Sequence, residues 1–180
     1  MPIKNNIYQT VRDKNNPDEV EKMGPFLCSD NPWLGEGYYF WDDVLDRAHW
    51  WGRIHYDRQY MICQARADIE NDKYLDLAGN MEQLKLFRKC YDEINKLHNG
   101  KVKTVQFVIE KLRRDKNFPY QAIRVLTEGC GGDEKVNFVE NNRRSFLNYS
   151  PPMQICIYEK SIVKDYYVIY PDECIHYEVV

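Results

Sequence analysis

Two glycines and a run of aromatic residues form the stretch of this sequence best suited to chemistry. Gly35-Glu36-Gly37 leaves room for a tight turn, and Tyr38-Tyr39-Phe40 follows directly. Trp50 lies on a predicted short helix that follows this strand. Two rings held by a strand and a nearby helix can enclose a planar group such as a nicotinamide. The same spacing is also typical of a core strand with Trp50 packed inside, so the residues alone leave both interpretations open.

The order of these residues resembles a motif of a known enzyme family. Gly35-x-Gly37 with Tyr39-Phe40, followed by Ala48-x-Trp50, is similar to the central motif of ADP-ribosyltransferases of the diphtheria-toxin/poly(ADP-ribose) polymerase type. The resemblance implies that Tyr39 stacks on the nicotinamide of NAD and that Trp50 closes the other side. Gly37 is assigned to the same cofactor site.

Two further stretches match the family pattern with a different residue at the key position. Met153–Tyr158 has the form of the strand that a catalytic Glu opens in the family, and Gln154 stands in place of that Glu. In Ile7–Thr10, Gln9 stands in place of a His that holds the ribose, and the backbone near Thr10 would contact the carboxamide. Glutamine accepts a hydrogen bond from a ribose hydroxyl but supplies no negative charge to a cationic transition state.

Either another residue supplies the missing charge, with Glu128 and Glu36 as the candidates, or the chain is a weak or inactive relative. The segment 122–129 and Gln154 resemble bacterial ADP-ribosyltransferase-like proteins in which Arg, Glu and Gln recur at these places. Arg124 either clamps the pyrophosphate, orients Glu128 through a bidentate pair, or points to solvent from a half-exposed strand. Ser29 either hydrogen-bonds the ribose or carboxamide, or is a plain turn residue.

The resemblance implies an NAD-dependent mono-ADP-ribosyltransferase that releases nicotinamide and needs no metal. By family habit, a small bacterial member is expected to be a toxin of a toxin–antitoxin or phage-defence system. Its partners would be an antitoxin or immunity protein and an acceptor that is RNA, DNA or protein. The N-terminal residues lack an apolar signal core, which predicts a cytoplasmic protein. Two other classes stay open: an NAD glycohydrolase with water as acceptor, and an inactive module that binds NAD, a nucleotide or a partner.

The elements that must position these residues follow from periodicity and turn residues. A short helix is predicted over 43–52, with Asp42-Asp43 as its cap and Gly52 as its stop, and a helical pair over 80–98 and 102–114. Strands are predicted over 7–10, 38–41, 60–69, 73–77, 120–128, 153–158, 166–170 and 175–179. This order indicates an α+β fold. The resemblance refines it to a split β-sandwich of two small mixed sheets in a single domain, 1–180, with the helical pair (about 80–114) inserted.

Composition excludes several other classes of protein. The chain has 180 residues, 43% of them hydrophobic and 14% aromatic, which argues against disorder. Its net charge of −3 argues against coating nucleic acid by bulk charge. The basic clusters at 113–116 and 143–144 are either solvated faces or a rim for a nucleic-acid substrate. No apolar run reaches the ~18 residues of a membrane span, and the six Cys lack the spacing of a zinc site.

Overall fold

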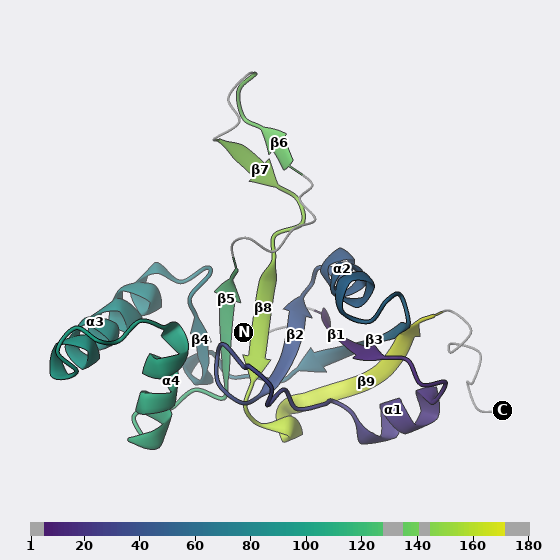
Figure 1. The fold of residues 1–180 in the computed structure, drawn as a ribbon, viewed down its shortest axis with the longest axis horizontal. Coiled ribbons are helices and arrows are strands. Elements are labelled where there is room, and N and C mark those ends of the chain that lie inside the picture. The colour runs from purple at the N-terminus through teal and green to yellow at the C-terminus, as the bar shows by residue number, and fades with distance from the viewer. Residues whose placement is uncertain (1–5, 128–134, 141–144, 172–180) are drawn as a thin grey trace.

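The computed structural model describes residues 6–127, 135–140 and 145–171, and its centre is a seven-stranded sheet with the order β4-β5-β8-β2-β1-β3-β9 (Figure 1). With the flanking helices, this confirms the predicted α+β fold. The strands are β1 (Asn6–Arg12), β2 (Tyr38–Asp42), β3 (Tyr60–Ala67), β4 (Tyr74–Asp76), β5 (Ala122–Leu126), β8 (Met153–Ile157) and β9 (Val163–Tyr170), and a separate hairpin contains β6 (Lys135–Asn137) and β7 (Phe146–Asn148). The helices are α1 (Pro17–Met23), α2 (Leu45–His55), α3 (Met81–Leu97) and α4 (Val105–Arg114).

The seven strands form one continuous sheet where the resemblance implied two small ones. All neighbours are antiparallel except β4 and β5. Strand β1 pairs with β3 along its whole length, but with β2 only at Ile7↔Asp42 and Tyr8↔Trp41. Those two register positions join strands β4-β5-β8-β2 to strands β1-β3-β9 at one end. Beyond Tyr8, β1 and β2 part. The sheet is therefore split only partly, between β1 and β2.

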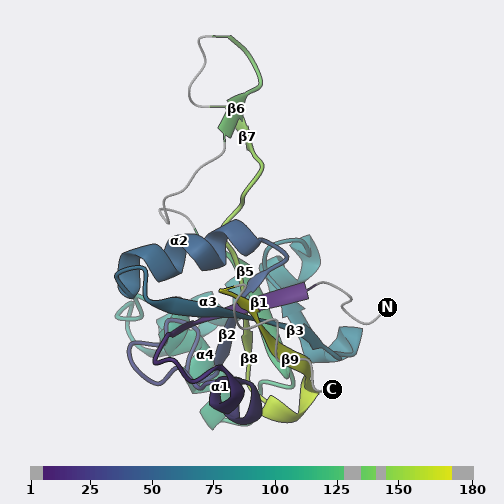
Figure 2. The ribbon, with the colours of Figure 1, turned by 90° about the vertical axis from the view of Figure 1, so that its right-hand side faces the viewer.

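Helices cover both faces of this sheet (Figure 2). Helix α2 packs Ala48 against Tyr8 and Trp41, while α1 packs Val20 against Met61 on the opposite face. Helices α3 and α4 cover Leu75, Ile123 and Cys156, and β9 curls so that Tyr166 packs near the core. Each fully buried aliphatic side chain contributes about 2 kcal/mol, so these clusters hold the sheet in its curled form.

Two details of the predicted α2 are wrong. Its N-cap is Val44 and not an aspartate. Asp42 cannot cap the helix because it is the last residue of β2 and its carboxylate pairs with Arg124. Gly52 does not stop the helix, which continues to His55. A Cβ at Gly52 would lie 2.3 Å from the Tyr60 ring, so the glycine lets α2 approach β3 closely.

The predicted helical pair is confirmed as α3 and α4, which follow β4 and precede β5 (Figure 1). Side-chain caps begin both helices: Asn80 accepts from the backbone of Glu82 and Gln83, and Thr104 accepts from Phe107. Short β4 and β5 run parallel, as a crossover through helices requires.

The hairpin of β6 and β7 was not predicted, and it stands away from the sheet (Figure 1). Both strands have only three residues, too few for the alternation that marks a strand in sequence. The predicted strand 175–179 lies outside the described residues. No helix among those described is long and apolar enough to cross a membrane.

Candidate functional site

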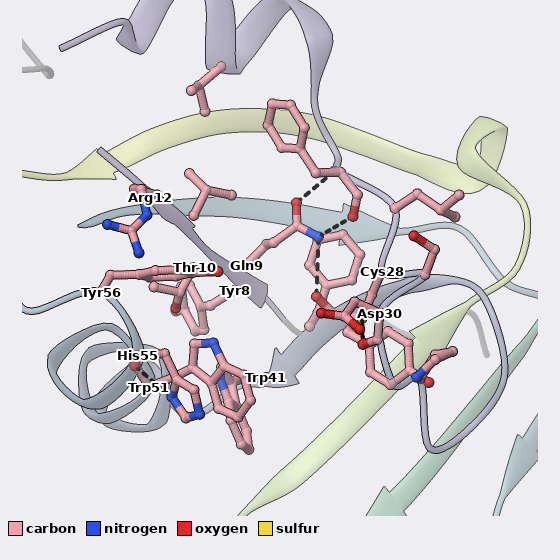
Figure 3. A pocket seen from close by; sticks show the side chains of 18 of the residues that line it. Tyr8, Gln9, Thr10, Arg12, Cys28, Asp30, Trp41, Trp51, His55 and Tyr56 are labelled. Carbon is pink, nitrogen blue, oxygen red and sulfur yellow. Dashed lines mark hydrogen bonds between the residues drawn. The ribbon is translucent and has the colours of Figure 1, made fainter. Parts of the chain in front are cut away.

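A cavity of about 990 Å³ opens where β1 and β2 part (Figure 3). Residues of β1, β2, α1, α2 and the segment 26–33 line it, together with Gln154 of β8. It contains six of the predicted site residues: Gln9, Thr10, Ser29, Tyr39, Trp50 and Gln154. These residues are far apart in the sequence, and the parting of the two strands brings them to one place.

Gln9 bridges the gap between the parted strands. Its amide nitrogen donates to the carbonyl oxygens of Phe26 (2.9 Å) and Tyr39 (3.3 Å), and its oxygen accepts from the Phe26 N–H and the Tyr166 hydroxyl. These four bonds use the hydrogen-bonding capacity of the amide. Thr10 is also engaged, because its hydroxyl donates to the Ala48 carbonyl. Both residues hold the wall of the cavity through bonds within the protein.

Tyr39 fastens the turn that precedes its own strand. Its hydroxyl accepts from Leu34 N–H at 2.8 Å and donates to the Gly35 carbonyl at 2.9 Å. Burial raises the pKa of Tyr39 well above its ordinary value, so the side chain is a neutral phenol. Gly37 does not line the cavity: a Cβ there would lie 2.5 Å from the Cys156 sulfur, so close packing requires this glycine.

Tryptophan rings form much of the cavity surface. All four Trp of the chain line it: Trp33, Trp41, Trp50 and Trp51. Trp50 meets Trp41 edge-on at 6.3 Å, and Trp51 stacks on His55 at 3.7 Å between ring centroids. Such rings offer flat surfaces on which a planar heterocycle can pack.

Two lining residues, Asn16 and Gln154, carry a buried side-chain oxygen without a partner among the described residues, and Gln154 is the one on the sheet. The residue is 5% exposed, and its side-chain oxygen is buried with no hydrogen-bond partner among the described residues. It lies beside Trp41 in the register of β8 and β2. A buried amide oxygen without a partner costs about 1–3 kcal/mol, so a donor on a ligand would gain this interaction.

Two charged residues of the cavity, Arg12 and Asp30, lie toward opposite ends (Figure 3). Figure 3 shows Arg12 and Tyr56 at one end and Cys28 and Asp30 at the other, with Gln9 between them. The Arg12 guanidinium lies over the Tyr56 ring at 5.3 Å. Burial raises the pKa of Cys28, so this thiol is not a thiolate nucleophile at neutral pH.

Arg124 is not among the lining residues but belongs to a separate ion cluster. It donates to Asp42 at 2.9 Å and forms a bidentate pair with Asp76 at 3.1 and 2.9 Å. Burial opposes the charge, but the hydrogen bonds to Asp76 and Asp42 outweigh it and raise the pKa of Arg124 above its ordinary value. Asp42 is only 2% exposed, so Arg124 supplies the charge that keeps this carboxylate stable in the fold.

Neither of the carboxylates that were expected to replace the family's Glu is found among the described residues that line the cavity. Glu128 lies outside the described residues, and Glu36 does not line the cavity; its backbone oxygen accepts from Arg113. The lining carboxylates are Glu19 and Asp30. Among the residues that the structure describes, no group of three His, Cys, Asp or Glu side chains could hold a metal ion.

Sequence reasoning missed several lining residues that the strand period indicates. Tyr8 and Arg12 are two positions either side of Thr10 on β1, and Trp41 is two positions after Tyr39 on β2. Side chains two apart in a strand share a face, so each predicted residue pointed to these neighbours. The strand period does not indicate three other lining residues, because they lie outside β1 and β2: Asp30, Trp51 and Tyr56.

Comparisons with protein-family models, with curated proteins and with solved structures find no match to this chain. The class of the protein is therefore given by its α+β fold and its aromatic cavity.

Proposed function

We propose that this protein is a mono-ADP-ribosyltransferase that binds NAD in the cavity and transfers ADP-ribose to a macromolecule. The observation that carries the proposal is Gln154, which lines an aromatic cavity and whose buried side-chain oxygen has no hydrogen-bond partner among the described residues. A ribose hydroxyl is a donor of the type this oxygen accepts. The volume of about 990 Å³ lies at the upper end of the usual range for ligand sites and suits a dinucleotide.

The cavity offers a place for each part of NAD. Tyr39 and Trp50 provide rings for the nicotinamide, next to Gln154 for its ribose. Arg12 and Lys14 provide positive charge for the diphosphate. The stacked Trp51 and His55 provide a flat surface for the adenine. The finer architecture proposed is accordingly that of an ADP-ribosyltransferase, with the partly split sheet as its cleft.

In the reaction, the bond between nicotinamide N1 and ribose C1′ breaks, and its electron pair leaves with the neutral nicotinamide. A nucleophilic atom of the acceptor then bonds to C1′ and loses its proton to solvent or to a carboxylate. Gln154 orients the ribose through the 2′-hydroxyl but does not neutralise the developing positive charge. Glu128 is the proposed source of negative charge, and Glu19 and Asp30 are the alternatives on the cavity wall.

A second function is favoured by two specific observations. Gln9 already uses its amide within the protein, and Gln154 is neutral. Both fit a module that binds NAD without turnover. An enzyme of the proposed kind would act as a toxin of a toxin–antitoxin or phage-defence system, with an antitoxin as partner.

Tryptophan fluorescence tests the binding step directly, because all four Trp line the cavity. NAD is titrated into wild type, Gln154→Leu and the matched control Gln64→Leu, which changes a glutamine of β3 that does not line this cavity. We expect quenching that saturates in wild type and the control, with an affinity about tenfold weaker in Gln154→Leu. No saturable change with NAD in wild type would overturn the proposal.

The catalytic step is tested with NAD labelled on its adenylate and a cell lysate treated with nuclease or protease. Label that enters a macromolecule together with nicotinamide release identifies a transferase and its acceptor class. Nicotinamide release without label transfer identifies a glycohydrolase. Saturable binding with no nicotinamide release identifies the binding module.

A further inference from the structure

The helical pair has a charge opposite to that of the rest of the chain. Residues 80–116 contain ten Lys and Arg but five Asp and Glu, a net charge of +5, whereas the whole chain carries −3. The remaining residues therefore carry −8. Nine of the ten basic side chains are exposed. Of these ten side chains, only Arg88 and Lys111 form ion pairs with described residues, namely Asp92 and Asp115.

The basic residues line up along the outer sides of both helices. On α3, Lys85, Lys89 and Lys96 share the side opposite buried Phe87 and Ile94. On α4, Phe107, Lys111 and Arg114 share the side opposite buried Ile109. The two helices contact each other beside β4 (Figure 1), and we call their two outer sides together the basic helical face.

Aromatic side chains accompany these charges. Phe107 is 39% exposed within the basic helical face and meets His98 edge-on at 5.2 Å. Trp33 is 42% exposed at the cavity. Cations interleaved with exposed rings fit single-stranded nucleic acid, in which phosphates pair with Lys and Arg while bases stack.

Helix α4 contacts the turn beside the cavity through Arg113, which lies on the same side of the helix as Ile109 and outside the basic helical face. Arg113 of α4 donates to the Glu36 carbonyl at 3.2 Å and lies over the Tyr158 ring at 4.2 Å. This is the turn that Tyr39 fastens from the cavity side. The neighbouring residues Asn31, Pro32 and Trp33 line the cavity itself. A strand bound along α4 would therefore reach the cavity at Trp33.

We infer that the basic helical face binds single-stranded nucleic acid and presents it to the cavity as the ADP-ribose acceptor. The role as acceptor rests on the proposed function; the binding of the strand does not. The net charge of −8 on the remaining residues repels a polyanion and directs it to α3 and α4.

The test measures binding of fluorescein-labelled 20-nucleotide RNA and DNA single strands by anisotropy, without NAD. The triple variant Lys85→Gln, Lys89→Gln, Lys96→Gln is compared with the control triple Lys22→Gln, Arg58→Gln, Arg66→Gln, which removes the same charge elsewhere. We expect the first to weaken binding and to reduce the slope of log affinity against log salt by about 2, and the control to do neither. Phe107→Ala should weaken binding about tenfold at unchanged salt slope.

Three outcomes would overturn the inference: no binding by wild type, equal losses in the two triple variants, or binding of polyglutamate as tight as that of RNA. The last would identify a surface for an acidic protein. Strand binding without label transfer from NAD to the strand or to protein would leave the strand-binding part of the inference standing and remove both the proposed transferase activity and the role as acceptor. Label transfer to protein, with no strand bound, would leave the transferase activity standing and remove the inference.

Discussion

Gln154 and Arg124 are neighbours in the sheet with opposite surroundings. Val125 is the register partner of Gln154, and Arg124 that of Ile155, so the two side chains leave adjacent strands on opposite faces. Gln154 lines the cavity, and its buried side-chain oxygen has no partner among the described residues. Arg124 meets Asp42 and Asp76, and each of its three guanidinium nitrogens donates to one of them.

This difference separates a binding residue from a structural one. A charged group that is already paired with two carboxylates has few hydrogen bonds left for a ligand. Removing that group leaves a buried carboxylate without a partner. A buried neutral oxygen without a partner stabilises nothing in the free protein and is available to a ligand. The comparison therefore predicts that changes at Arg124 affect stability and changes at Gln154 affect binding.

The largest effect on stability is expected for Arg124→Met. The change leaves Asp42, at 2% exposure, as an unpaired buried carboxylate, which costs about 3 kcal/mol in the free energy of unfolding. Urea denaturation measures this loss. Adding Asp42→Asn should restore part of it, because the remaining buried group is then neutral. A loss below about 1 kcal/mol would contradict the structural role assigned to Arg124.

A smaller loss is expected for Tyr39→Phe, which removes the partner of both Leu34 N–H and the Gly35 carbonyl. We expect about 1.5 kcal/mol in urea denaturation. Tyr91→Phe is the matched control, since that hydroxyl donates only to the Val102 carbonyl and should cost about half as much. Equal losses would mean that the turn at Leu34 and Gly35 does not depend on the two bonds.

Gln154→Leu should not destabilise the protein and should raise the free energy of unfolding by about 1 kcal/mol, because the oxygen it removes is buried without a partner. The variant should also lose most of the rise in melting temperature that saturating NAD gives wild type. Thermal unfolding with and without NAD measures both quantities. A destabilisation as large as that of Arg124→Met would show that Gln154 is structural.

The smallest effect is a pH dependence of stability from His49, behind the cavity wall on α2. Burial, with a contribution from Arg53, lowers the pKa of His49 below 6.5, and the ring contacts the Tyr60 hydroxyl at 3.0 Å. The unfolded chain binds the proton more readily, so stability is complete above pH 6.5 and falls as the pH drops through 6.5 toward the folded pKa. Urea midpoints at pH 7.5 and 5.5 should differ less in His49→Gln than in wild type. An unchanged difference would assign the dependence to other groups.

Most elements could be predicted because local pattern determines them. The apolar positions of α3 recur with the helical period, and Asn80 supplies its cap, so the helix over 80–98 was found to within two residues at each end. Only the middle of its predicted apolar face is buried, with Phe87 and Ile94 inside and Met81 and Leu97 exposed. Periodicity gives the side on which a residue lies, but the packing partner decides whether water reaches it.

The sequence by itself determined the α+β order of elements, the aromatic stretch around Tyr39 and the opposite charges of the helical pair and the remainder. Only the tertiary structure decided that Gln9 bridges parted strands and that Arg124 pairs with Asp42 and Asp76. It also decided that four tryptophans meet around one cavity. The physical reason is that helix and strand periods arise between near neighbours. Strand register and the parting of β1 from β2, in contrast, depend on contacts between residues distant in the chain.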